Sequence, residues 1–397
     1  MASRSPSAHV LIVGGGGTGG ALAHDLALRG VKVTLVERGE LTSGTTGRHH
    51  GLLHSGARYA VNDQESAVEC IEENRILRRI APGSFEENDG LFVAVTEEDL
   101  EYLPDFLEGC AATGIPAQQL TPEEALRLEP NLNPALLAAV RVPDATMDAM
   151  RMPLRFFATA KANGADILNY VDVTGLIVDQ GTVTGAAVRD LVTGREARID
   201  ADIVVNATGP WSEQVARMAG VDVPIQPSPG VMLAVRGRLC NMVLNRLHRS
   251  GDGDIIVPQR ALSVVGTSSW TVEDPDHLDV PQDHVERMVE EGSKLIPAVR
   301  QAAFRAAWSA ARPLIGTKED ADSGRELSRT FKTIDHALED RVEGFVTITG
   351  GKGTTLRGMA ELCANVIVGK LGIEEACRTR ETVLLPHDAA FTRGAVA

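Results

Sequence analysis

The sequence predicts an α/β protein with α+β insertions, in which a Rossmann-type dinucleotide-binding domain is built from segments far apart along the chain. Three observations predict this fold class. A glycine-rich turn separates an apolar strand from a helix near the amino terminus, two later apolar strands also end in glycines, and the intervening chain is rich in strand signals. Strands that alternate with helices are typical of a parallel sheet, and the strand-rich insertions predict a second sheet.

The first element is a βαβ unit. Residues 10–13 form a short apolar run that predicts a buried parallel strand, residues 20–29 carry apolar side chains at helical spacing, and residues 31–36 form the next strand. A strand, a glycine turn, a helix and a second strand within about thirty residues form a βαβ unit.

The later elements follow from the same periodicities. Helices are predicted at residues 64–80, 99–112 and 359–371, and a further helix start at residues 121–124, where Thr121 is the cap and Pro122 the first helical residue. Strands are predicted at residues 91–95, 138–142, 175–178, 183–188, 203–205 and 345–348, with more strand signals over residues 231–267.

The length predicts two connected domains, because 397 residues are many for a single core. We expect residues 8–85, 145–212 and 340–386 to form the dinucleotide domain. Residues 86–144 and 213–339 then form a sheet-rich substrate domain. The acidic residues Glu319, Asp320 and Asp322 are expected in a solvated loop.

The composition excludes several classes of protein. The net charge of −15 argues against a nucleic-acid binder, and no apolar stretch is long enough to span a membrane. The start of the chain does not read as a secretory signal. Five scattered cysteines without a CxxC pair predict reduced thiols and no metal or iron–sulfur site. These features predict a cytoplasmic protein.

The glycine turn predicts the dinucleotide site. Gly14, Gly16 and Gly19 form G-x-G-x-x-G between the first strand and the first helix, where glycines allow a tight turn and close approach of the backbone to a pyrophosphate. Glu37 ends the second strand and can accept hydrogen bonds from an adenosine ribose. Residues 203–209 and 347–351 are later strands with glycine turns, and a cofactor approached from three distant segments favours FAD over NAD.

Four segments resemble the FAD-dependent glycerol-3-phosphate dehydrogenases, most of all the large subunit of the anaerobic bacterial enzyme. They are residues 45–59 (TTGRHHGLLHSGARY), 206–211 (NATGPW), 311–314 (ARPL) and 350–352 (GGK), and the resemblance covers residues 10–386. It implies a D-amino-acid-oxidase-like fold, with a discontinuous Rossmann-type FAD-binding domain and an antiparallel-sheet substrate domain that roofs the flavin. It also implies oxidation of the secondary alcohol of sn-glycerol 3-phosphate to dihydroxyacetone phosphate in glycerol metabolism, with hydride passing to FAD and electrons passing through partner subunits to a quinone.

The resemblance and the motifs together assign candidate site residues. The expected FAD contacts are Gly14, Gly16, Gly17, Thr18, Gly19, Glu37, Arg38, Thr45, Thr46, His49, His50, Gly51, Leu52, Val173, Ala207, Thr208, Gly209, Trp211, Gly351, Lys352, Gly353, Thr354 and Thr355.

The substrate requires cations for its phosphate and a base for its hydroxyl proton. Matching the family motifs, Arg58, Arg312 and Lys352 are expected to hold the phosphate or polarise the reacting oxygen, and Tyr59 to donate a hydrogen bond. His54 is the expected base, since histidine has a suitable unperturbed pKa. Arg312 and Lys352 are therefore both catalytic and substrate-binding candidates.

Three departures from the family pattern bear on function. The chain ends at Ala397 without the cysteine-rich carboxy-terminal domain of the large subunit, so we expect a different electron path or another subunit. Gly353 and Leu356 stand where the family has a Leu and a Tyr. Residues 229–232 (PGVM) stand where aerobic members have a Lys-Gly-Ser-His segment, which moves the chain away from the aerobic branch.

Other functions stay open at this point. A longer polyol phosphate or a 2-hydroxy acid such as L-2-hydroxyglutarate would use the same arginines, and a flavin electron-transfer subunit without alcohol chemistry is a third class. The electron acceptor can be a quinone, oxygen or a partner subunit. The protein can be free in the cytoplasm or peripheral at the inner face of the cell membrane.

Overall fold

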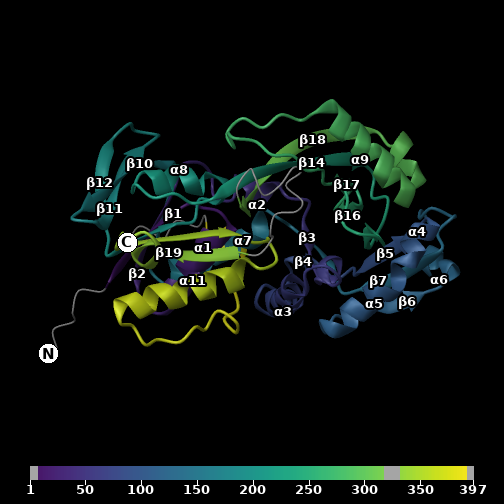
Figure 1. The fold of residues 1–397 in the computed structure, drawn as a ribbon, viewed down its shortest axis with the longest axis horizontal. Coiled ribbons are helices and arrows are strands. Elements are labelled where there is room, and N and C mark those ends of the chain that lie inside the picture. Colours follow the sequence, from purple (N-terminus) through teal and green to yellow (C-terminus); the bar gives the residue numbers. More distant parts are fainter. Residues whose placement is uncertain (1–7, 317–330, 391–397) are drawn as a thin grey trace.

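A six-stranded sheet organises the part of the chain that carries the glycine turn. The structure, a computed structural model, describes residues 8–316 and 331–390 (Figure 1). The strand order is β19-β20-β13-β1-β2-β9, with every neighbouring pair parallel except β19 and β20. The strands are β1 (His9–Val13), β2 (Lys32–Glu37), β9 (Asp166–Asn169), β13 (Ile203–Asn206), β19 (Phe331–Asp335) and β20 (Phe345–Gly350).

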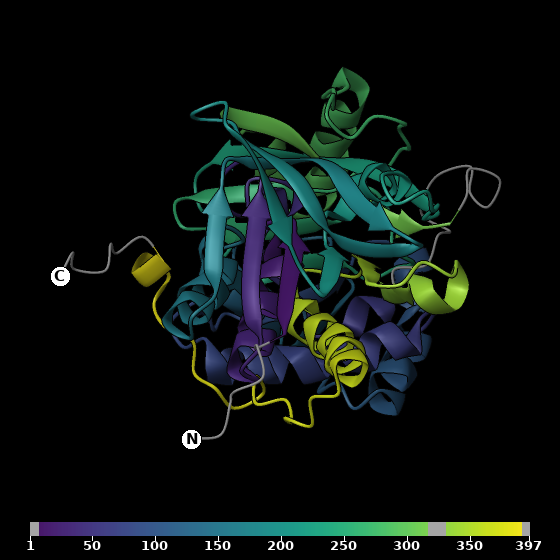
Figure 2. The same ribbon diagram turned by 90° about the vertical axis from the view of Figure 1, so that its left-hand side faces the viewer.

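Both faces of this sheet are covered, which explains why its strands are almost uninterrupted apolar runs. Along β1, Val10 and Ile12 pack with helices α1 (Gly17–Leu28), α7 (Arg151–Ala162) and α11 (Leu356–Leu371). The alternate residues Leu11 and Val13 pack against a three-stranded antiparallel sheet. This sheet comprises β10 (Val171–Asp179), β11 (Thr182–Asp190) and β12 (Glu196–Asp200). Figures 1 and 2 show α11 on one side of the six strands and β10–β12 on the other.

An eight-stranded sheet forms the other half of the molecule, on the right of Figure 1. It is antiparallel apart from the pair β15 and β5, so the expected antiparallel sheet contains one parallel pair. Its order is β18 (Phe304–Ile315), β14 (Ile225–Arg236), β17 (Leu262–Gly266), β16 (Ile255–Gln259), β15 (Val243–Arg246), β5 (Gly90–Ala94), β7 (Ala138–Val142) and β6 (Gln118–Leu120). Helix α9 (Gln282–Leu295) packs on β14.

The structure contains further helices, a small sheet and 3-10 turns. They are α2 (Thr45–Arg48), α3 (Gln64–Ile80), α4 (Glu97–Glu101), α5 (Leu103–Ala112), α6 (Pro122–Leu128), α8 (Ser212–Arg217), α10 (His336–Glu339), the small sheet of β3 (Leu52–Leu53), β8 (Ala145–Met147) and β4 (Phe85–Glu86), and 3-10 turns at Ala57–Tyr59, Gly209–Trp211, Pro297–Gln301 and His387–Ala390.

Local signals predicted these elements well. The βαβ unit, the helix at residues 64–80 and the Thr121 cap are confirmed, and Thr121 and Glu124 form a complete capping box. Three helix predictions need correction. The helix predicted at residues 359–371 begins at Leu356. The first helix begins at Gly17, inside the glycine turn, and residues 99–112 form parts of two helices, because Pro104 starts a new helix after Tyr102.

The division into two domains stays a proposal, and two of its boundaries divide a sheet. The boundary between residues 85 and 86 lies inside β4, where Glu86 pairs with Thr146 of β8. Strand β19 pairs with β20, so a boundary at residue 340 cuts the six-stranded sheet, and a boundary before Phe331 keeps it whole. Glu319, Asp320 and Asp322 lie outside the described residues. Within the described ranges, no helix has the length and apolar character needed to cross a membrane.

Candidate functional site

A cavity of about 510 Å³ lies where the six-stranded and eight-stranded sheets meet. Its lining comes from the carboxyl ends of β1, β2, β13 and β20 and from strands β14 and β18 of the second sheet. In open parallel sheets this end of the strands is where ligands bind. The volume is in the usual range for ligand sites in proteins.

The glycine turn has the geometry that a dinucleotide requires. Gly14 has φ +114°, and a β-carbon there would lie 2.6 Å from the carbonyl oxygen of Ala207. A β-carbon on Gly19 would lie 2.0 Å from the oxygen of Gly14, so the close packing of helix on strand allows only glycine there. The N-cap of α1 is Gly16, which supplies no side-chain oxygen to the first turn. The cavity therefore receives a helix N-terminus suited to an anion.

Glu37 is held at the adenosine end of the expected site. Its carboxylate accepts hydrogen bonds from the backbone N–H groups of Gly15 and Gly39, both at 2.7 Å. These bonds fix the side chain at the end of β2, where it lines the cavity. An ionised carboxylate has about four acceptor positions, so it can still accept hydrogen bonds from ribose hydroxyls.

The segment after the glycine turn connects both sheets. Thr46 Oγ accepts a hydrogen bond from Gly17 N at 3.0 Å, and Thr45 Oγ donates to the oxygen of Ala311 at 2.6 Å. Trp308 Nε1 donates to the oxygen of Arg48 at 2.6 Å. Helix α2 therefore joins the start of α1 to strand β18.

Three histidines follow on this segment and line the cavity. His49 and His50 accept backbone hydrogen bonds at Nδ1, from Gly51 at 2.9 Å and from Leu52 at 3.2 Å. Burial lowers the pKa of His49 to about 4. Burial, with His49 and two arginines nearby, lowers the pKa of His50 to about 3. Both imidazoles are neutral at pH 7 and can donate only at Nε2.

His54 is fixed through its backbone. Its N–H donates to Thr354 Oγ at 3.0 Å, and its carbonyl accepts from Asn74 Nδ2 at 3.0 Å. Burial, His50 and the cations Arg58 and Lys352 hold the pKa of His54 well below its usual value. Its ring is therefore neutral at pH 7 and able to accept a proton.

The predicted cations Arg312 and Lys352 both line the cavity. Arg312 is oriented by three backbone carbonyls, because its guanidinium donates to Ser228 at 3.1 Å and to Pro229 and Ser268 at 2.9 Å. Lys352 follows β20, and its Nζ donates to Ser66 Oγ at 2.9 Å. The same ammonium lies 4.7 Å from the centroid of the Tyr59 ring.

Arg58 does not line the cavity. It forms a nearly buried ion pair with Asp254, with N–O distances of 2.6 and 2.8 Å to the two carboxylate oxygens. Burial opposes ionisation of Asp254, but Arg58, His248 and the N–H of Gly251 outweigh it and lower the pKa of Asp254. The geometry therefore does not support the predicted substrate contact of Arg58, because its charge is already paired.

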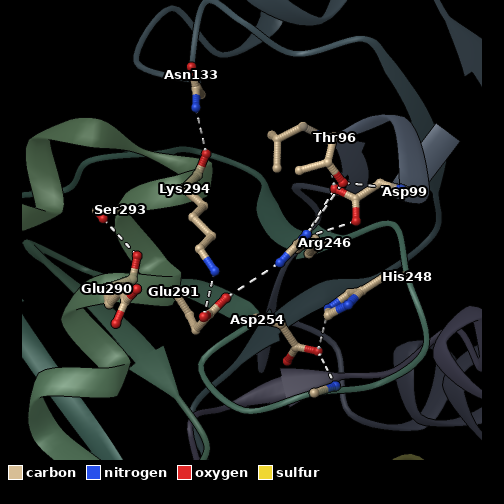
Figure 3. A network of polar contacts seen from close by, with 12 residues as sticks. Thr96, Asp99, Asn133, Arg246, His248, Asp254, Glu290, Glu291, Ser293 and Lys294 are labelled. Atoms are coloured by element: carbon tan, nitrogen blue, oxygen red, sulfur yellow. Dashed lines mark hydrogen bonds and ion pairs between the residues drawn. The ribbon is translucent and has the colours of Figure 1, made fainter.

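The loop that carries Asp254 is itself anchored. Figure 3 shows His248 beside Asp254, at 3.3 Å, and Arg246 in the neighbouring network. Arg246 donates to both carboxylate oxygens of Asp99 and pairs with Glu291, so α4, β15 and α9 meet at one guanidinium. No local motif marks these residues, and sequence reasoning missed them.

The structure brings most predicted site residues to one cavity. Those that line it are Gly14, Gly16, Gly17, Thr18, Glu37, Arg38, Thr45, Thr46, His49, His50, Leu52, His54, Tyr59, Val173, Ala207, Thr208, Gly209, Trp211, Arg312, Gly351, Lys352 and Gly353. Gly19, Gly51, Thr354 and Thr355 lie next to the lining without forming it. Met147, Gln214, Met232, Asp276 and Leu278 line it without having been predicted.

The residues present fit FAD. The glycine turn at a helix N-terminus would hold the pyrophosphate, and the fixed Glu37 carboxylate would hold the ribose. Neutral histidines and apolar side chains also line the cavity.

Comparisons with known proteins agree with this fit. Residues 9–365 match the family described as FAD dependent oxidoreductase (DAO). One subunit of the anaerobic glycerol-3-phosphate dehydrogenase of Escherichia coli (strain K12) is 43% identical over 382 residues, covering 96% of this chain and 70% of that protein. The corresponding subunit of the Haloferax volcanii enzyme is 44% identical over 406 aligned positions, covering 98% and 68%.

Solved structures show the same fold. The glycerol-3-phosphate dehydrogenase of Bacillus halodurans, complexed with FAD, has a TM-score of 0.72 and 24% identity over 97% of this chain and 68% of that one. Glycine oxidase of Bacillus cereus has a TM-score of 0.73 and 23% identity over 91% and 97%. The fold is D-amino-acid-oxidase-like and the cofactor is FAD. The chain belongs to the FAD-dependent oxidoreductase family, and within it to the group of these anaerobic glycerol-3-phosphate dehydrogenase subunits.

Proposed function

We propose that this protein oxidises the secondary alcohol of sn-glycerol 3-phosphate to dihydroxyacetone phosphate. The observation that carries the proposal is the neutral His54 in a cavity that also holds the cations Arg312 and Lys352. An anionic substrate with a hydroxyl to be deprotonated requires both kinds of group. The curated relatives named for this dehydrogenase support the choice of substrate.

The cations bind and orient the phosphate. Lys352 is held by Ser66 and lies over the Tyr59 ring, and Arg312 is held by backbone carbonyls, so both side chains are preorganised. Preorganised donors lose little entropy when the substrate binds. Tyr59 also lines the cavity and can donate its hydroxyl to the substrate.

His54 accepts the hydroxyl proton at its imidazole. FAD bound in the cavity would supply the acceptor for the hydride that leaves the carbon bearing this hydroxyl. A bound phosphate dianion partly offsets the positive charge of Lys352, which otherwise lowers the pKa of His54. Substrate binding therefore makes His54 a stronger base at the time it is needed.

Gly353 lies where the size of the substrate is limited. The family has a larger residue there, and the smaller glycine would leave room for a longer polyol phosphate. A β-carbon on Gly353 would lie only 3.0 Å from His49 Nε2, so the His49 ring already occupies that side. This contact favours the three-carbon substrate.

The test is anaerobic mixing of the FAD-loaded protein with sn-glycerol 3-phosphate while the visible flavin absorbance is followed. We expect rapid bleaching and one equivalent of dihydroxyacetone phosphate. Flavin that stays oxidised with this substrate, but is bleached by a tetritol phosphate, a pentitol phosphate or L-2-hydroxyglutarate, would replace the proposal with the matching alternative. Flavin that no alcohol bleaches would indicate an electron-transfer subunit.

We also propose that the electrons leave through a partner subunit to a quinone at the inner face of the membrane. The relatives are themselves named as subunits of a larger enzyme, which supports a partner. Reoxidation of the reduced flavin by a soluble quinone analogue should then be faster than by oxygen. Faster reoxidation by oxygen would make the protein an oxidase instead.

A further inference from the structure

Residues 267–279 connect β17 to α9 and border the cavity at both ends, with Thr267 near the start and Asp276 near the finish. At the start, the oxygen of Ser268 accepts a hydrogen bond from Arg312 at 2.9 Å. Further along, Val272 N donates to the oxygen of Pro227 at 3.0 Å. The segment therefore runs from the substrate cations, along β14, to the adenosine end of the site.

The far end of the segment contacts the FAD-binding half through the side chain of Asp276. Asp276 Oδ1 accepts a hydrogen bond from the guanidinium of Arg38 at 2.5 Å and another from Trp211 Nε1 at 2.9 Å. The guanidinium carbon of Arg38 also lies 4.7 Å from the centroid of the Trp211 ring. One carboxylate oxygen therefore joins two residues that come after different strands of the six-stranded sheet.

The place of this contact is set by the glycine-turn motif. Arg38 directly follows Glu37, the acid expected at the adenosine ribose, and Trp211 ends the 3-10 turn after β13. Arg38, Trp211 and Asp276 all line the cavity. Asp276 thus bridges the two halves at the adenosine end.

We propose that Asp276 slows the release of FAD. Its two contacts hold the segment of residues 267–279 closed over the adenosine half of the cofactor. Release of the adenosine half requires the bonds from Asp276 to Arg38 and Trp211 to break. These contacts affect the rate of FAD release and do not depend on the substrate. The proposal can therefore be tested whether or not glycerol 3-phosphate is oxidised.

Salt should weaken the ion pair between Arg38 and Asp276. The side chains of Arg38 and Asp276 are 45% and 39% exposed, so their attraction is screened by mobile ions. The exposed ion pair and the hydrogen bond from the Trp211 N–H to the carboxylate should each slow FAD release by a factor of roughly a few. Loss of the carboxylate should then speed FAD release by roughly tenfold.

The experiment measures FAD release from holoenzyme diluted into an excess of an apoflavoprotein trap, by the recovery of fluorescence or of trap activity. We expect Asp276→Ala to release FAD roughly tenfold faster than the unmodified protein. Asp279→Ala is the matched control, because it removes the same charge from an exposed site on the same segment, and its release rate should change less than about twofold.

Salt supplies the second readout. Raising NaCl from about 0.05 to 0.5 M should speed release from the unmodified protein more than from the Asp276 variant, which has no ion pair left to screen. If Asp276→Ala does not fold, Asp276→Asn removes the charge with little change in shape. Equal release rates for the Asp276 variant and Asp279→Ala, or equal salt dependence with and without Asp276, would overturn the proposal.

Discussion

Lys352 Nζ lies 2.9 Å from Ser66 Oγ, so the first turn of α3 orients the ammonium that reaches the cavity after β20. The two residues are 286 positions apart in the sequence. Tyr59 completes the arrangement, with its ring 4.7 Å from the same nitrogen. The direction in which Lys352 points is therefore set by a helix that itself contributes nothing to the cavity lining.

The first prediction concerns this orientation. Ser66→Ala removes a hydrogen bond to a charged group, which contributes about 1.5–3 kcal/mol. We expect KM for the phosphorylated substrate to rise roughly tenfold, with a smaller change in kcat and in the FAD content. Steady-state rates measure it.

Ser66→Thr is the control, since threonine keeps a hydroxyl at this position and should restore most of the affinity. A rate on unphosphorylated glycerol that falls as much as the rate on the phosphate ester would contradict a role in phosphate binding.

The second prediction concerns Arg58. Removal of one partner of a buried ion pair leaves a charge without compensation and costs about 3–5 kcal/mol. Arg58→Met and Asp254→Asn should therefore both lower the free energy of unfolding substantially, as measured by urea denaturation. Arg260→Met, at an exposed pair with Asp148, should change it by less than about 1 kcal/mol.

A substrate ligand would give another result. If Arg58→Met left the unfolding free energy unchanged and raised only KM, the arginine would have to reach the substrate in solution. The pairing with Asp254 instead predicts a large loss of unfolding free energy and no separate rise in KM.

Arg58 also shows which features the sequence alone could not predict. The dinucleotide site was predictable because each requirement is local: the glycines, the strand before them, the helix after them and Glu37 all lie within residues 9–37. Arg58 and Tyr59 are adjacent in one 3-10 turn, yet only Tyr59 lines the cavity. Arg58 instead meets Asp254, 196 residues away, and no local pattern records such a partner.

The same distinction applies to the fold. Strand β20 was predicted at residues 345–348 from its apolar run. Its antiparallel neighbour β19 was not assigned to the same sheet. The break between α4 and α5 has a local cause in Pro104, and the sequence alone could have shown it. No local sequence pattern predicts the contacts of Asp276, because its partners follow β2 and lie in the turn after β13.

The third prediction concerns pH. A base must be neutral to accept a proton, and the pKa of His54 lies well below 6.5 in the folded protein. His54 therefore stays neutral as the pH falls through 6.5, and kcat/KM should not decline between about pH 7.5 and 6 on its account. His54→Gln should lower kcat by about 10²-fold or more at every pH in this range.

The measurement is a pH profile of kcat/KM with the FAD-saturated enzyme. A decline centred near pH 6.5 that is present in the unmodified protein and absent from His54→Gln would mean that His54 titrates normally. His54 would then be exposed to water in the working enzyme.

The fourth prediction concerns His24, which is fully buried on α1. Neither of its ring nitrogens has a hydrogen-bond partner within the described residues. Burial, with a smaller effect of Arg357, lowers its pKa from 6.5 to about 4. The unfolded chain therefore binds a proton that the folded protein excludes. Stability from this group is complete above pH 6.5 and is lost as the pH falls toward 4, by about 3 kcal/mol in all.

His24→Leu keeps the volume similar and removes the titration, so its unfolding free energy should fall less than that of the unmodified protein between pH 7 and 4.5. The other buried histidines are present in both proteins, and the difference between the two pH profiles isolates His24. His277→Leu, at an exposed histidine, is the control and should not flatten the profile. Parallel profiles for His24→Leu and the unmodified protein would show that His24 is hydrated or paired in solution, because only an unpartnered buried imidazole excludes the proton.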